Sequence, residues 1–103
     1  MIFFYVPLAD AQMVKEAMFA AGAGELGNYK RCSWQCEGVG QFEPKEGADP
    51  HIGSVGNIEH VKELKVEIVC SNDSLKAAVE ALKRTHPYEE PAFGIVKLSN
   101  HKI

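Results

Sequence analysis

The stretch that decides the fold is Ile2-Phe3-Phe4-Tyr5-Val6, which Pro7 closes. Its β-branched and aromatic residues are typical of a β-strand. The strand is apolar on both faces, because successive side chains of a strand point to opposite sides and none of these five is charged. A strand of this kind lies in the interior of its sheet and requires cover on both sides. The rest of the sequence therefore has to supply neighbouring strands and a covering layer.

Two helices are predicted from apolar residues at helical spacing. The first follows the N-cap residue Asp10 and ends at Gly22, which favours a left-handed C-cap. The second begins at Asn72 and stops before His86, because the residue ahead of Pro87 is disfavoured in the α region. Their expected buried stripes are Met13, Val14, Ala17, Met18 and Ala21 in the first helix, and Leu75, Ala78, Val79 and Leu82 in the second.

Period-two alternation predicts three further strands, over residues 28–38, 58–70 and 92–98. The sequence Gly38-Val39-Gly40 indicates a turn, after which residues 41–42 form a short returning strand. Residues 43–57 hold two prolines and three glycines with few apolar side chains, so they form a long loop. A loop of this length in a small domain is typically functional or mobile, and we expect it to be the least ordered part of the chain unless a ligand or subunit orders it.

The element order β-α-β-β-α-β predicts an α+β, ferredoxin-like fold, with a four-stranded antiparallel sheet and both helices on one face. We expect residues 1–103 to form a single domain. The helices would leave one face of the sheet open, although strand 2–6 is apolar on both faces. The sequence therefore predicts that the second face packs against another subunit.

Composition excludes several classes of protein. The chain has 103 residues, 46% hydrophobic and 24% charged, which is typical of a globular domain and not of a disordered one. A net charge of −3 gives no basic surface for nucleic acid or an anionic membrane. The first apolar run is too short for a membrane helix and lacks a basic flank, so no membrane association is expected. Three cysteines are too few for a disulfide scaffold, which favours a reducing, cytoplasmic location.

Two motifs have plain structural interpretations. The segment Gly22–Gly27 matches G-x-G-x-x-G, but it follows a helix and precedes a strand, which is the reverse of the dinucleotide-binding arrangement. We interpret it as a helix C-cap and turn. In an extended strand Cys32 and Cys36 would lie roughly 13 Å apart, too far for a disulfide or a shared zinc ion. They share a face with Trp34 and are expected, like Cys70, to be buried as small hydrophobic residues.

The densest polar cluster is the segment 86–91, with the sequence HPYEEP. Its two prolines hold it extended, so His86, Tyr88 and Glu90 are expected to share one side. An imidazole, a phenol and a carboxylate held together could coordinate a divalent metal or hydrogen-bond a polar ligand. We predict His86 and Glu90 as candidate metal ligands and Tyr88 as a residue that lines the same cleft.

Two further residues complete this candidate site. Glu89 would point the opposite way in an extended chain and is a lower-ranked ligand-binding candidate. His51, in the long loop, could reach into the cleft and is also assigned to ligand binding. The alternative is structural: His86 caps the preceding helix, where its cation is favourable, and Tyr88 packs at a subunit contact.

The sequence supports no catalytic assignment. It contains no P-loop, no nucleophile elbow and no cysteine paired with a histidine. We therefore predict no catalytic residues.

Three segments together resemble a known family, the YqfO proteins, which are the bacterial branch of the NGG-interacting-factor-three-like family. The resemblance is to their inserted domain and runs from about residue 21 to 98. The segments are Ala21–Tyr29 with Cys32–Trp34, Gly38–Gly53, and His86–Ala92.

The resemblance implies a fold similar to the PII signalling proteins and to CutA, the divalent-cation-tolerance protein. Both are trimers of ferredoxin-like subunits, and PII proteins bind nucleotides and effectors between subunits with a loop equivalent to residues 43–57. The dinuclear metal ligands of the full-length family lie outside the insert. The chain also lacks the basic residues with which PII proteins hold ATP, since Arg31 and Arg84 are its only arginines.

These arguments favour a homotrimeric, PII/CutA-like module that binds a small ligand or a divalent metal in a regulatory role. The cofactor, if there is one, would be a divalent metal, and the identity of the ligand stays open. The alternatives are a structural or adaptor domain without a small-molecule ligand, an enzyme subunit that donates residues to a composite site, or a non-catalytic partner of a metal-dependent hydrolase of the same family.

Overall fold

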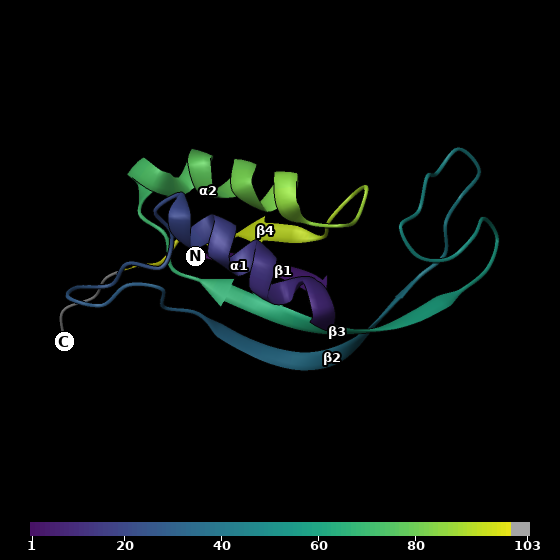
Figure 1. Ribbon diagram of the computed structural model, residues 1–103, viewed down its shortest axis with the longest axis horizontal. Coiled ribbons are helices and arrows are strands. Elements are labelled where there is room, and N and C mark those ends of the chain that lie inside the picture. The colour runs from purple at the N-terminus through teal and green to yellow at the C-terminus, as the bar shows by residue number, and fades with distance from the viewer. Residues whose placement is uncertain (100–103) are drawn as a thin grey trace.

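The computed structural model describes residues 1–99, which form a sheet covered on one face by two helices (Figure 1). The predicted ferredoxin-like order is confirmed. The elements are β1 (Ile2–Pro7), a 3-10 turn (Leu8–Asp10), α1 (Ala11–Ala20), β2 (Trp34–Phe42), β3 (Glu59–Ile68), α2 (Asn72–Thr85) and β4 (Phe93–Ile95). Within residues 1–99 neither helix combines the length and the apolar character that a bilayer crossing requires.

The sheet has the strand order β2-β3-β1-β4, and every neighbouring pair is antiparallel. β1 is an internal strand, as its two apolar faces predicted. Phe4 of β1 lies opposite Val66 of β3 on one side and opposite Phe93 of β4 on the other. This register directs Ile2, Phe4 and Val6 toward the helices.

The core lies between the sheet and the helices. Phe4 is fully buried, together with alternate residues of β1 and β3 and the apolar stripes of both helices. The buried hydrophobic residues are Ile2, Phe4, Val6, Ala11, Val14, Met18, Ala23, Val66, Ile68, Ala78, Ala81 and Leu82. The expected stripe of α2 is confirmed, since Leu75 and Val79 pack against this cluster. In α1, Met13 is exposed instead of buried, because it lies on the outer side of the helix.

The opposite face of the sheet has no helix over it (Figure 1). We call it the open face. The register places there the aromatic side chains of Phe3, Tyr5 and Trp34, the charged side chains of Glu63, Lys65 and Glu67, and Cys36. Trp34 is 57% exposed and Tyr5 is 37% exposed. The ring of Phe3 lies over Gly94 of β4, where a Cβ atom would overlap it.

β2 differs from the sequence prediction. It begins at Trp34 instead of residue 28 and runs without a turn through Gly38 and Gly40 to Phe42, paired with β3 along its whole length. The predicted turn at residues 38–40 is therefore wrong. The glycines do not reverse the chain, because Gly40 instead leaves room for a side chain of the neighbouring strand to lie across β2.

The last strand and the cysteines also require correction. β4 covers only Phe93–Ile95 and not residues 92–98. Its pairing with β1 ends there, because Ile95 lies opposite Ile2, the first residue of β1. Cys36 is exposed, not buried, since its side chain projects from the open face. Cys32 precedes β2 and is partly exposed. Cys70 packs against the core, and burial raises the pKa of its thiol.

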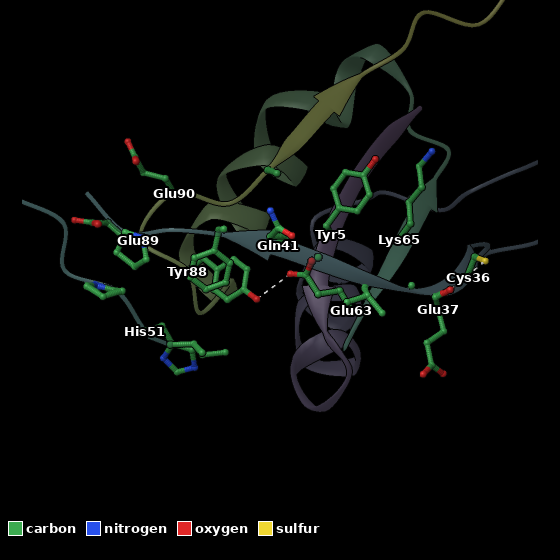
Figure 2. Close-up of a pocket in the computed structure, with 18 of the residues that line it drawn as sticks. Tyr5, Cys36, Glu37, Gln41, His51, Glu63, Lys65, Tyr88, Glu89 and Glu90 are labelled. Carbon is green, nitrogen blue, oxygen red and sulfur yellow. Dashed lines mark hydrogen bonds between the residues drawn. The ribbon is translucent and has the colours of Figure 1, made fainter. Parts of the chain in front are cut away.

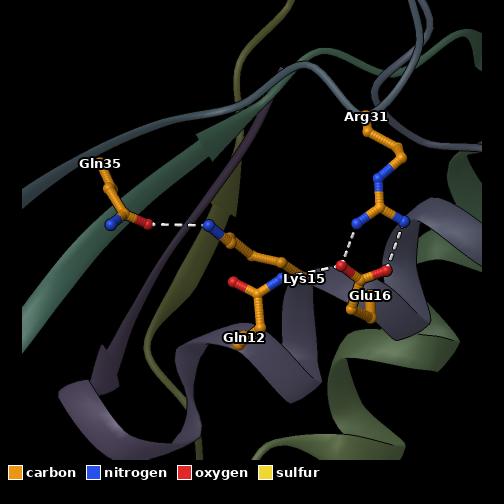
Figure 3. A network of polar contacts seen from close by, with 5 residues as sticks. All are labelled: Gln12, Lys15, Glu16, Arg31 and Gln35. Carbon is orange, nitrogen blue, oxygen red and sulfur yellow. Dashed lines mark hydrogen bonds and ion pairs between the residues drawn. The ribbon is translucent and has the colours of Figure 1, made fainter.

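The connection from α1 to β2 is fastened to α1 by polar contacts (Figure 3). Gly22 has a φ of 104° and its amide donates to the Phe19 carbonyl, so the glycine motif is a helix end and turn, as expected. Arg31 has a φ of 60° and forms an ion pair with Glu16 of α1. Because both side chains are exposed, the pair mainly orients the connection.

Truncation of Phe4 tests the role of β1. We expect Phe4→Ala to lower the free energy of unfolding by about 3–5 kcal/mol, because a fully buried ring leaves a cavity between the sheet and the helices. Urea denaturation measures the change. Leu8→Ala is the control, since Leu8 is 41% exposed and should change stability by no more than about 0.5 kcal/mol. A loss at Phe4 no larger than at Leu8 would contradict the central position of β1.

Candidate functional site

A groove runs along the open face and encloses about 820 Å³. Its walls come from β2, β3, the β2–β3 loop and the segment that follows α2 (Figure 2). The loop and this segment lie far apart in the sequence, yet they close the same end of the groove. A volume of this size is in the range that binds a small molecule.

The β2–β3 loop is tied down at two points. The Gly56 amide donates to the Pro44 carbonyl at 2.9 Å, which closes the base of the loop, and Pro44 is buried. The Asp49 amide donates to a carboxylate oxygen of Glu89 at 3.1 Å. This second bond links the loop directly to the segment after α2, so a hydrogen bond holds the two walls of the groove together.

His86 fastens the segment after α2 to the core. Its side chain is only 6% exposed, and its two ring nitrogens are both hydrogen-bonded. Nε2–H donates to the Tyr5 carbonyl of β1 at 2.7 Å, while Nδ1 accepts from the Tyr88 amide at 3.1 Å. This pattern requires a neutral imidazole, because Nδ1 must keep its lone pair.

The electrostatics agree with that protonation state. Burial lowers the pKa of the His86 imidazole, although the Tyr5 carbonyl and the carboxylates of Glu63 and Asp10 act in the opposite direction. His86 is also the C-cap residue of α2, and its backbone amide donates to the Leu82 carbonyl. The side chain does not act as a cationic cap, however, because it points to β1.

The same bonds bear on the predicted metal site. In this arrangement His86 offers no free lone pair, and Glu90 is exposed at the rim of the groove. Among residues 1–99, no three side chains of histidine, cysteine, aspartate or glutamate are grouped as a metal site requires. The donors therefore do not fit a metal as they stand. Coordination by His86 and Glu90 stays a prediction that would require the His86 bonds to be exchanged.

Tyr88 is the centre of the closed end of the groove. Its hydroxyl donates to Glu63 Oε2 at 2.8 Å (Figure 2). Its ring centroid lies 5.0 Å from His86, 6.0 Å from Phe42 and 6.4 Å from His51. Burial and the neighbouring Glu63 carboxylate raise the pKa of the Tyr88 phenol well above its usual value. The phenol thus stays protonated and acts as a hydrogen-bond donor to Glu63.

The structure brings all five predicted site residues to one region. His51, Tyr88, Glu89 and Glu90 line the groove, and His86 lies behind Tyr88. The expected alternation along the segment is wrong, because residues 87–90 form a bend and not an extended strand. Glu89 and Glu90 consequently both line the groove.

Sequence reasoning missed Glu63, Gly40 and Phe42. The carboxylate of Glu63 lies across Gly40, where a Cβ atom would overlap it. A glycine inside a strand signals such a close approach. A predicted turn at Gly40 gives no indication of a partner on β3. The same prediction places Phe42 in a short returning strand and not in the groove wall.

Comparison with known proteins shows that most of this chain is homologous to one part of longer proteins. The GTP cyclohydrolase 1 type 2 homolog of Mycobacterium leprae is 49% identical over 94 residues, which are 91% of this chain and 24% of that protein. The homolog of Halalkalibacterium halodurans is 42% identical over 96 residues, covering 93% of this chain and 26% of that protein. No family model matches the chain.

Solved structures agree with this result. A Bacillus cereus protein related to NIF3 matches with a TM-score of 0.81 and 34% identity, over 96% of this chain and 25% of that one. The periplasmic divalent cation tolerance protein CutA from Archaeoglobus fulgidus matches with a TM-score of 0.67 and 16% identity, over 98% of this chain and 84% of that one. The chain is thus homologous to the NIF3-related proteins over about a quarter of their length, and it shares the fold of CutA.

Replacement of His86 should give a pH-dependent loss of stability. At pH 8 we expect His86→Phe to lower the free energy of unfolding by about 1–3 kcal/mol for each partner left unpaired, the Tyr5 carbonyl and the Tyr88 amide. Because the folded pKa of His86 is depressed, its contribution is present above about pH 6.5 and is lost as the pH falls below that value. Urea denaturation between pH 8 and pH 5 measures the difference from wild type.

The matched control is His60→Gln, because His60 is exposed on β3. This variant should keep the pH dependence of the wild type. A difference between wild type and His86→Phe that grows on acidification would show that His86 is protonated in the folded protein.

Gly40→Ala should disturb the site without unfolding the protein. The added methyl group meets only the end of the flexible Glu63 side chain, which can rotate away, so stability should change little. The Tyr88 hydroxyl would then lose its acceptor, and the pKa of this phenol should fall relative to wild type. Gly38→Ala is the control, because a methyl group at Gly38 meets nothing within 4 Å. NMR titration of the tyrosine rings distinguishes the two variants, and equal Tyr88 titration in both would contradict the contact.

Proposed function

We propose that this chain, homologous to about a quarter of the NIF3-related GTP cyclohydrolase 1 type 2 homologs, is a small-ligand binding module that assembles as a homotrimer. The observation that carries the proposal is the groove of about 820 Å³ on the open face. The module would act by binding, and it is assigned no catalytic step. The activity named for the whole relatives concerns proteins of which this chain spans only about a quarter.

The construction of the groove supports ligand binding. Its closed end is formed by residues held in place before any ligand arrives, because Tyr88 is bonded to Glu63 and its backbone to His86. The loop wall is attached to the same end through the bond between Asp49 and Glu89. A preorganised site loses little conformational entropy on binding, which favours affinity.

The open face supports assembly. It carries the aromatic side chains Phe3, Tyr5 and Trp34 around the charged row of β3, and neither helix covers it. Large aromatic side chains gathered on an exposed face are typical of a subunit interface. Packing of three open faces would bury part of the Phe3 and Tyr5 surface and place the groove at the boundary between subunits. His51 in the loop and Glu90 at the rim would then lie near a neighbouring chain.

Assembly is tested by light scattering. We expect wild type to elute with about three times the chain mass of 11.3 kDa. Tyr5→Asp should dissociate the trimer, because it replaces an aromatic ring at the subunit contact with a carboxylate that would lose its hydration there. Met13→Asp is the control, since Met13 is 53% exposed on the far side of α1. A stable monomer in wild type at micromolar concentration would contradict the proposed assembly.

Binding is tested by a thermal-shift screen of small amines, carboxylates, nucleotides and divalent metals. We expect an organic compound to raise the melting temperature of wild type and to have a smaller effect on Tyr88→Ala. A response to zinc or copper alone, abolished in His86→Ala and Glu90→Ala and weakened at pH 5.5, would favour the metal-binding alternative. Intact assembly without any response would favour the adaptor alternative.

A further inference from the structure

We propose that the groove takes a small organic ammonium ion, whose charged head lies beside the carboxylate of Glu63. This inference rests on the proposed function, since it names the chemical class of the ligand for the same groove. It follows from the charge of the lining, from the unused hydrogen-bonding capacity of Glu63 and from the aromatic rings around it.

The charge balance of the lining is strongly negative. The groove is lined by five glutamates and one lysine, namely Glu37, Glu63, Glu67, Glu89, Glu90 and Lys65. Lys65 is already engaged, because its ammonium lies 5.4 Å from the centroid of the Phe3 ring. Arg31, which forms the single ion pair found within residues 1–99, is bonded to Glu16 outside the groove. A phosphate or carboxylate ligand would thus meet repulsion, while a cation would be attracted.

Glu63 gives the attraction a specific position. Its carboxylate is half-buried and accepts one hydrogen bond, from the Tyr88 hydroxyl to Oε2. No cationic side chain of the described residues lies within ion-pair distance of it. A carboxylate can accept about four hydrogen bonds, so most of its capacity is unused. An ammonium group placed there would supply an opposite charge and the missing hydrogen-bond donors.

The surroundings of Glu63 select an organic cation over a hydrated metal ion. Tyr88, Phe42 and His51 form an aromatic wall with centroid separations of 6.0–6.4 Å about Tyr88. The faces of aromatic rings attract ammonium groups, and their apolar surface packs against the carbon atoms attached to the nitrogen. A divalent metal prefers several oxygen or nitrogen ligands, which this wall does not offer. An amine that carries an apolar or aromatic group uses both features.

The test compares three probes that share a benzyl group and differ in charge: benzylammonium, benzyl alcohol and benzyl phosphate. Each is titrated into the full chain at pH 7 and followed by amide NMR. We expect benzylammonium to shift the amides of residues 40–42 and 88–90 and to bind about tenfold or more tightly than benzyl alcohol. Benzyl phosphate should bind more weakly than either.

Two variants show whether the charge of Glu63 is responsible. Glu63→Gln keeps an acceptor for the Tyr88 hydroxyl, so the fold is retained, and it should abolish the preference for benzylammonium over benzyl alcohol. Glu80→Gln removes the same charge from the exposed surface of α2 and should leave the preference unchanged.

The outcomes separate this inference from the proposed function. Equal or tighter binding of benzyl alcohol or benzyl phosphate at the same residues would overturn the ammonium assignment and leave the groove as a ligand site. An undiminished preference in Glu63→Gln would overturn the role of that carboxylate. Absence of shifts at residues 40–42 and 88–90 with all three probes at millimolar concentration would overturn both this inference and the proposed groove.

Discussion

The backbone of Tyr5 is the constraint on which the fold and the groove both depend. Its amide donates to the Ala92 carbonyl at 3.2 Å, and its carbonyl accepts from His86 Nε2 at 2.7 Å. The two bonds hold both ends of the segment between α2 and β4 against β1. β1 itself is fixed by apolar burial, since Phe4 and Val6 on either side of Tyr5 are fully buried. The site is therefore positioned by the core and not by the loop.

The polar groups of the site lie in two layers, one buried against the core and one at the open face. His86 is buried and neutral, and it uses both nitrogens to hold backbone groups in place. Glu63 lies nearer the open face and accepts a hydrogen bond from the Tyr88 hydroxyl. The tyrosine connects the layers, since its backbone is fixed by the imidazole and its hydroxyl is fixed by the carboxylate. Glu63 is thus connected to the buried His86 through two hydrogen bonds, one donated by the Tyr88 hydroxyl and one by the Tyr88 amide.

The sequence was sufficient to predict those elements whose structure is determined by local periodicity. The two apolar faces of residues 2–6 predicted an internal strand, and the apolar stripe of residues 72–85 predicted a helix that ends before His86. It was insufficient where the outcome depends on a neighbouring strand. Gly40 marks a turn or a close approach, and only the position of Glu63 on β3 distinguishes them. The predicted site residues were found together, but their chief acceptor was not, because an isolated glutamate in an alternating strand carries no signal of its own.

The start of β1 and the residue after β4 lie side by side, which bears on how such a module can occur within longer proteins. The Met1 ammonium donates to the Val96 carbonyl at 2.7 Å, and the Val96 amide donates to the Met1 carbonyl at 2.7 Å. The first strand thus starts where the last one finishes, which is the geometry that permits a domain to be inserted into another chain. The β2–β3 loop lies at the opposite end of the sheet (Figure 1). A fold connected through Met1 and Val96 would leave the groove and the open face clear. This geometry agrees with the homology, which covers about a quarter of the longer relatives.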